Sequence, residues 1–312
     1  MLGWWAGVYS GGSYGFNNPD GVAFDGTHIW VVNNAGNSVT ELDANNGAWV
    51  RTLSGGSYAF DDPVAVAFDG THIWVTNYGG TSVTEVDAST GAWVATLAGG
   101  SYAFSSPFAV AFDGTHIWVA NFSSSSLTEA NASTGAWVAT LTNSINSSYA
   151  FNSLRGVAFD GTHIWVTNNF GNSVTELDAN NGAWVQTLSG GSYAFNSPYG
   201  IAFDGTHIWV TNNLGNSVTE LDASNGAWVA TLSGGSYGFN NPVGVAFDGS
   251  DIWVANQNGN SVTELDAANG AWMQTLSGGS YAIADPFGVA FDGTHIWVTN
   301  TGGASVTEIP TG

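Results

Sequence analysis

A unit of about 44 residues occurs seven times along the 312-residue chain, and this repetition limits the folds open to the sequence. A tryptophan in an Ile-Trp-Val motif marks each copy, at Trp30, Trp74, Trp118, Trp165, Trp209, Trp253 and Trp297. Successive markers lie 44 residues apart, except for one interval of 47 residues that ends at Trp165. Each unit is too short to bury an apolar face alone, so we expect residues 1–312 to form one domain of packed repeats.

Each copy contains four short segments with the composition of β-strands. In the first copy these are GVAFD, HIWVVN, SVTELD and AWVRTL, which alternate apolar with polar residues and are rich in β-branched and aromatic types. An Asp-Gly turn signal and two Asn/Gly-rich junctions separate them. Four antiparallel strands in such a period are typical of a β-propeller blade, so the sequence predicts an all-β, seven-bladed β-propeller.

A second tryptophan series predicts how the ring closes. It lies in a Gly-Ala-Trp motif, at Trp49, Trp93, Trp137, Trp184, Trp228 and Trp272, and has one member fewer than the first. The last copy stops at SVTEIPTG and so lacks a fourth strand. One period of 44 before Trp49 is Trp5. We therefore expect residues 4–9 to form the outer strand of the C-terminal blade and to close the ring.

The charge of the chain excludes two classes of partner. Its net charge is −22, it has no lysine, and Arg51 and Arg155 are its only Lys or Arg residues. Nucleic acids and anionic membranes are bound through Lys and Arg, so neither is expected as a partner, and no apolar run predicts membrane insertion. The chain has no cysteine, so its cysteine content does not indicate whether its compartment is oxidising or reducing. The N-terminus lacks signal-peptide features, but the acidity favours an extracellular or cell-surface location.

Histidines and carboxylates recur at fixed positions in the copies. A histidine follows the Asp-Gly turn in six copies, and Asp251 replaces it in the sixth copy. Equivalent positions in separate blades lie too far apart to share one metal ion, and equivalent carboxylates do not form an acid–base pair with separated pKa values. We therefore assign these residues, and both tryptophan series, to structural roles, and we predict no catalytic residue, metal ligand or cofactor.

Two positions vary between copies that are otherwise nearly constant. The first opens the innermost strand and reads Asp20, Val64, Phe108, Arg155, Tyr199, Val243 and Phe287. The second opens the loop between the second and third strands and reads Asn34, Tyr78, Phe122, Asn169, Asn213, Gln257 and Thr301. Both should lie on one face, at a mouth of the central channel. We predict an aromatic-lined concave ligand site there, formed by Arg155, Asp20, Phe108, Tyr199, Phe287, Tyr78 and Phe122.

The fourth copy departs most from the pattern. The segment TNSINSSYAFNSLRG carries a three-residue insertion, replaces the usual proline with Leu154, and continues with Arg155. Asp20 belongs to a blade three positions away, too far for an ion pair across an open channel. Arg155 should therefore be free to meet an anionic or carbonyl group of a ligand. Drift at a solvent-filled channel mouth would also produce such variation.

The repeat resembles a known family. SPYGIAFDGTHIWVTNNLGNSVTELD is similar to the NHL-type repeat, with its Pro-x-Gly-Ile-Ala opening, Asp-Gly turn and Ile-aromatic-Val strand. The phrases HIWVTN and NSVTELD also resemble the YVTN group of surface-protein propellers. The resemblance implies the propeller fold for the whole chain. Its implications for function are diverse, because related propellers include virginiamycin B lyase-like and gluconolactonase-like enzymes, RNA binders and binding modules.

The leading functional prediction is a non-catalytic binding or scaffold propeller of a bacterial secreted or surface protein. It would be a monomer that binds a protein, peptide, small molecule or glycan over the channel mouth. Three alternatives remain open. They are a lyase-like or lactonase-like enzyme with a divalent cation such as Ca or Mg in the channel, a multivalent lectin, and a recently amplified or designed repeat without an evolved ligand.

Overall fold

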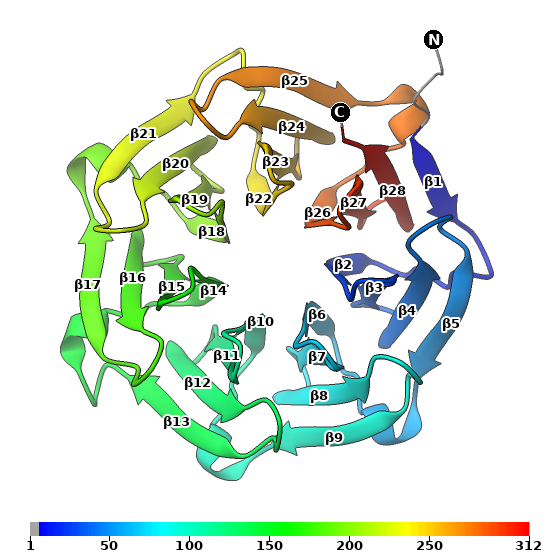
Figure 1. Cartoon of the computed structure of the whole chain (residues 1–312), viewed down its shortest axis with the longest axis horizontal. Helices are drawn as coiled ribbons and strands as arrows, with labels where there is room; N and C mark the ends of the chain where they lie inside the picture. The colour runs from blue at the N-terminus through cyan, green and yellow to red at the C-terminus, as the bar shows by residue number, and fades with distance from the viewer. Residues whose placement is uncertain (1–5, 312) are drawn as a thin grey trace.

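The computed structural model describes residues 6–311, which form seven four-stranded antiparallel sheets arranged as blades around a central channel (Figure 1). The innermost strands are β2 (Pro19–Phe24), β6 (Pro63–Phe68), β10 (Pro107–Phe112), β14 (Leu154–Phe159), β18 (Pro198–Phe203), β22 (Pro242–Phe247) and β26 (Pro286–Phe291). The second strands are β3 (His28–Asn33), β7 (His72–Asn77), β11 (His116–Asn121), β15 (His163–Asn168), β19 (His207–Asn212), β23 (Asp251–Asn256) and β27 (His295–Asn300). The predicted seven-bladed propeller is confirmed.

The outer half of each blade completes the sheet. The third strands are β4 (Ser38–Asp43), β8 (Ser82–Asp87), β12 (Ser126–Asn131), β16 (Ser173–Asp178), β20 (Ser217–Asp222), β24 (Ser261–Asp266) and β28 (Ser305–Pro310). The outermost strands are β5 (Trp49–Ser54), β9 (Trp93–Ala98), β13 (Trp137–Thr142), β17 (Trp184–Ser189), β21 (Trp228–Ser233), β25 (Trp272–Ser277) and β1 (Gly7–Ser10). Five single-turn 3-10 helices follow outer strands, at η1 (Gly56–Tyr58), η2 (Gly100–Tyr102), η3 (Ser147–Tyr149), η4 (Gly191–Tyr193) and η5 (Gly279–Tyr281). None of the helical segments described is long and apolar enough to cross a membrane.

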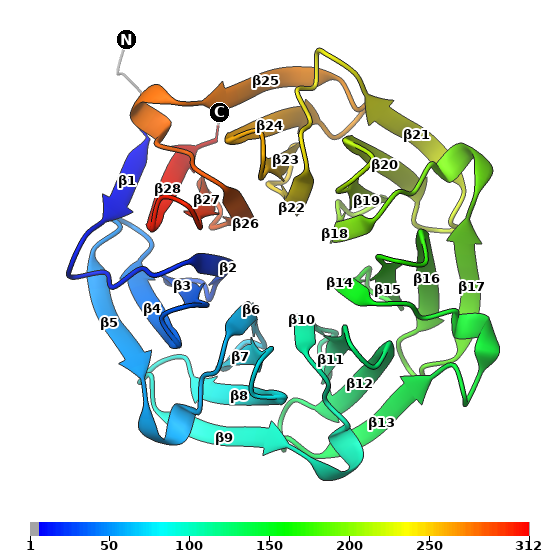
Figure 2. The same cartoon turned by 180° about the vertical axis from the view of Figure 1, so that it is seen from behind.

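The N-terminal strand closes the ring as predicted. β1 lies beside β28 and pairs antiparallel with it (Figure 2). In this pairing Gly7 lies opposite Glu308. In the first blade Arg51 lies opposite the equivalent residue, Glu41. Gly7 precedes Arg51 by 44 residues, so β1 has the register that the repeat period predicts. The strand runs from Gly7 to Ser10 instead of over the predicted 4–9. Trp5, on which the prediction depended, lies outside the described residues.

The core lies between neighbouring blades. The seven Ile-Trp-Val tryptophans are fully buried. Trp30, for example, shares a cluster with Ile73 and Val75 of the next blade. Its indole nitrogen donates to Asp25 of the Asp-Gly turn, with 2.7 Å between Nε1 and Oδ2. Because each interface repeats around the ring, every blade depends on both neighbours for burial.

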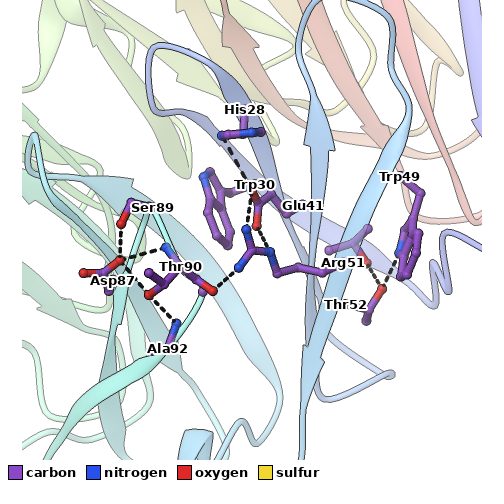
Figure 3. A network of polar contacts seen from close by, with 12 residues as sticks. His28, Trp30, Glu41, Trp49, Arg51, Thr52, Asp87, Ser89, Thr90 and Ala92 are labelled. Carbon is purple, nitrogen blue, oxygen red and sulfur yellow. Dashed lines mark hydrogen bonds and ion pairs between the residues drawn. The ribbon is translucent and has the colours of Figure 1, made fainter.

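The recurring histidines contact carboxylates within their own blades. In the first blade, His28 Nδ1 lies 3.3 Å from Asp25 Oδ2. The same atom lies 3.6 Å from Glu41 Oε1 (Figure 3). Arg51 Nε lies 2.7 Å from Glu41 Oε2, and its guanidinium also donates to the Thr90 carbonyl in the second blade. Burial raises the pKa of Glu41, and the Arg51 charge offsets part of that rise. Arg51 therefore serves the packing of two blades.

The second tryptophan series differs from the expectation. The six Gly-Ala-Trp indoles are between 41% and 45% exposed, because outer strands are sheet edges with no neighbour on one side. Each indole nitrogen donates to the hydroxyl of the threonine three residues later, as Trp93 does to Thr96 at 2.9 Å. The structural role predicted for this series stays a prediction, because one part of each ring is held by the threonine and another is open to solvent.

Candidate functional site at the channel mouth

A break in each inner β-ladder positions the first variable residue. In the fourth blade Leu154 pairs with Asn168 and Val157 with Val166, so Arg155 and Gly156 lie in a bulge. Gly156 packs against the carbonyl of Tyr199 in the next blade, where a Cβ atom would lie 2.5 Å from that oxygen. The Thr167 hydroxyl accepts from the Gly156 amide at 2.7 Å and donates to the Tyr199 carbonyl at 2.8 Å. These contacts fix the backbone at Arg155 relative to the backbone at Tyr199.

The Arg155 guanidinium lies among three aromatic rings. Its Cζ atom is 4.1 Å from the ring centroids of both Phe108 and Phe122, and 5.1 Å from that of Tyr199. Its single side-chain hydrogen bond is a long one, 3.5 Å from Nη1 to the Tyr199 hydroxyl. Within residues 6–311 no carboxylate pairs with this cation, and its buried Nε has no hydrogen-bond partner. Cation–π contacts stabilise the guanidinium but do not neutralise it.

The predicted aromatic residues form one contiguous aromatic cluster of Tyr78, Phe108, Phe122, Tyr199 and Phe287. Ring centroids lie 5.7 Å apart for Phe108 and Tyr199, and 5.9 Å apart for Tyr199 and Phe287. Tyr78 lies 6.2 Å from Phe108 and 6.4 Å from Phe122. These residues come from the second, third, fifth and seventh blades, so the cluster reaches across the channel.

The mouth is narrower than the predicted open concavity. A cavity of about 190 Å³ lies in the channel and is lined by the innermost strands of all seven blades. Sites that enclose a drug-sized ligand have volumes of about 300–1,000 Å³. The large aromatic side chains fill much of the space that the backbone ring leaves open. A ligand larger than a few atoms would therefore lie over the mouth instead of inside the channel.

Asp20 differs from the other predicted site residues. Its side chain is 8% exposed and receives one long hydrogen bond, 3.3 Å from Asn18 Nδ2. Burial raises the pKa of Asp20 to about 7. The structure shows no ion pair between Asp20 and Arg155 among the residues it describes. The Asp20 carboxyl thus lies at the same channel mouth as the Arg155 guanidinium without forming an ion pair with it.

Comparison of the copies missed two exposed apolar residues. Phe170 and Leu214 follow the second variable position in the β15–β16 and β19–β20 turns, and each is 64% exposed. The Phe170 ring centroid lies 5.8 Å from that of Phe122, so Phe170 extends the aromatic cluster outward. The other copies have small or polar residues here, at Ala35, Gly79, Ser123, Asn258 and Gly302. Extending the comparison by one position would have found both residues.

The other departures in the fourth blade are structural. Leu154, which replaces the proline, is fully buried in the cluster shared by the third and fourth blades. In the lengthened segment, the Asn143 side chain accepts from the Phe151 amide at 2.9 Å and donates to its carbonyl at 2.8 Å. Arg155 and Phe170 are therefore the departures in this blade that lie at the channel mouth.

No three His, Asp or Glu side chains in the described range are arranged to bind a metal ion. The divalent cation considered from the resemblance stays an untested alternative.

Comparisons with known proteins define the class of fold. No protein-family model matches the chain, and no curated protein matches it. A streptogramin B lyase structure superposes with a TM-score of 0.77 at 16% identity over 99% of both chains. A catalytically inactive virginiamycin B lyase from Staphylococcus aureus, solved with quinupristin, gives a TM-score of 0.78 at 16% identity over 98% of this chain and 99% of that one.

A hydrazine synthase from Kuenenia stuttgartiensis gives a TM-score of 0.76 at 19% identity over 95% of this chain and 96% of that one. The protein is thus a seven-bladed β-propeller. In particular, its backbone superposes on the propellers of these lyases over nearly the whole of both chains. Identities this low establish the fold and do not transfer an activity.

Proposed function

We propose that this protein is a non-catalytic binding module whose ligand lies over the channel mouth and contacts Arg155. One observation carries the proposal. Arg155 is a cation held among aromatic rings with no carboxylate partner among the described residues, and its buried Nε lacks an acceptor. Arg155 is partly buried, and a charge partly removed from water interacts more strongly with an incoming anionic group than an exposed arginine does.

The contrast with Arg51 supports this assignment. Arg51 lies opposite Glu41 and forms an ion pair with it, and the other blades have alanine, glutamine or, in the seventh blade, glycine at that position. Arg155 occupies a position that varies in size, charge and aromaticity from copy to copy. The Val-Ala-Phe-Asp residues beside it, in contrast, stay nearly constant.

Replacing Arg155 should abolish anion binding at the mouth. We expect a screen of small carboxylates, phosphates and neutral amides by ligand-observed NMR to yield anionic compounds that bind the wild-type protein. Arg155→Met keeps an apolar side chain against the rings but removes the charge, and should weaken these compounds by about 10-fold or more, because hydrogen bonds to charged groups contribute about 1.5–3 kcal/mol. Arg51→Gln removes the other arginine and is the matched control, since glutamine occurs there in two blades. Undiminished binding to folded Arg155→Met would refute the assignment.

A second candidate function, multivalent glycan binding, rests on the outer tryptophans. Their indoles are evenly distributed around the ring, partly exposed, and oriented by threonine hydrogen bonds. An oriented indole with an open face can stack against the apolar face of a sugar ring.

This candidate predicts several equivalent sites per chain. A glycan that binds should titrate with a stoichiometry of up to six, and Trp93→Ala should reduce that number by one without changing the affinity of the remaining sites. Isothermal titration after a glycan-array screen measures both quantities. A single site, or no glycan bound at millimolar concentration, would leave the outer tryptophans without this role.

A further inference from the structure

The charge of the whole molecule limits the anions that the channel mouth can accept. The net charge is −22, and of the two arginines Arg51 is already paired with Glu41. A ligand with several negative charges would be repelled by this field at every approach. A ligand with one anionic group is repelled much less, and it still makes a favourable contact with Arg155. The site therefore favours a singly charged ligand.

The packing of Arg155 favours a carboxylate as that group. Aromatic rings lie against the Arg155 guanidinium, and they offer no oxygen acceptor to its N–H groups. Among those groups, Nη1 makes one long bond to Tyr199 and Nε makes none. A planar fork of N–H donors matches the two oxygens of a carboxylate.

The apolar surface begins beside the cation and extends away from the channel. Phe122 contacts the Arg155 guanidinium, and Phe170 contacts Phe122 while exposing 64% of its own surface. Leu214, equally exposed, occupies the equivalent turn of the next blade. Single exposed apolar residues are common on proteins. Here, however, Phe170 is continuous with the aromatic cluster that surrounds the charge, so the carboxylate should be attached to an apolar body.

The size of the site favours an extended ligand over a compact one. The channel cavity of about 190 Å³ is too small to enclose a drug-sized ligand. Phe170 and Leu214 lie on different blades, so a ligand that covers both must span more than one side chain. A polypeptide end combines one carboxylate with several apolar side chains in sequence, and capture of a chain end is a recurring mode of peptide recognition.

We propose, on the basis of the function inferred above, that the channel mouth binds the carboxyl-terminal end of an apolar polypeptide. The terminal carboxylate contacts Arg155, and the preceding side chains lie over Phe122, Phe170 and Leu214. The rest of the partner extends over the face formed by the β15–β16 and β19–β20 turns.

Two peptide pools test the proposal. Both contain N-acetylated tetrapeptides of random sequence, one ending in a free carboxylic acid and the other in an amide. The intact protein is immobilised, and the retained peptides are identified by mass spectrometry. We expect retention of the free-acid pool to exceed that of the amide pool by about 10-fold or more, with enrichment of apolar final residues.

Variants separate the two parts of the site. Arg155→Met should remove the preference for the acid over the amide. Phe170→Ser should weaken the retained free-acid peptides several-fold and should leave N-acetylated single amino acids unaffected. Ile145→Ser is the matched control, because Ile145 is 67% exposed but lies between β13 and η3, outside the site.

The outcomes distinguish this inference from the function on which it rests. Equal retention of acid and amide pools overturns the inference. So does equal affinity for single acetylated amino acids and tetrapeptides, which would indicate a small carboxylic acid as the ligand. If no peptide pool is retained but small anions still bind in an Arg155-dependent way, the proposed function holds and the peptide is not the ligand. If no anion or peptide depends on Arg155, both fail.

Discussion

Deleting residues 1–10 is expected to destabilise the whole propeller by about 3 kcal/mol or more. The deletion removes β1, leaves β28 as an unpaired edge, and removes Tyr9, whose ring stacks on the buried Trp297 with centroids 5.6 Å apart. Loss of a packed aromatic side chain alone costs about 3–5 kcal/mol. Because every blade packs on both neighbours, the loss should appear as a lower midpoint of a single cooperative urea transition followed by tryptophan fluorescence.

Two substitutions at Tyr9 show where the effect comes from. Tyr9→Ala should reproduce a large part of the loss, since the ring also packs against Gly47 of the first blade. Tyr9→Phe keeps the ring and removes the hydroxyl that donates to Glu308, so its effect should be smaller. An unchanged urea midpoint for the deletion would show that pairing of the chain ends does not stabilise the ring.

Asp20 is expected to make the protein less stable as the pH rises from about 4 to about 7. Its carboxyl has an ordinary pKa near 3.8 when unfolded, and burial raises that pKa to about 7 in the folded protein. Between these values the folded chain binds a proton that the unfolded chain has lost, so folding stability falls with increasing pH and levels off above about 7. One pKa unit corresponds to about 1.4 kcal/mol, so the ionised carboxylate costs on the order of 4 kcal/mol.

Asp20→Asn isolates this contribution. The variant should match the wild type at pH 4 and exceed its free energy of unfolding at pH 8, as measured by urea titration at both values. Asp61→Asn removes a carboxylate from an exposed position and controls for the change in net charge. A constant difference between Asp20→Asn and the wild type across this pH range would show that Asp20 is not held neutral by burial.

The candidate site was predictable in composition but not in shape. Because the copies are nearly identical, differences between them identified Arg155, Phe108, Tyr199 and Phe287 without any structural information. The distances that give these residues chemical meaning join different blades. Arg155 meets Phe122 and Phe108 across the interface between the fourth and third blades, and Tyr199 meets Phe287 across the channel. No spacing along the chain encodes those contacts.

The sequence by itself determined the number of blades, their four-strand pattern and the register of the closing strand. All three follow from strand periodicity and from a constant repeat length, which are local properties of the chain. Only the tertiary structure decided that the mouth is narrowed by contacting rings, that the outer tryptophans are half-exposed, and that Arg155 lacks an anionic partner within the described residues. The reason is physical. Burial and charge pairing depend on which side chains of different blades come into contact, and the packing of the blades in the closed ring determines those contacts.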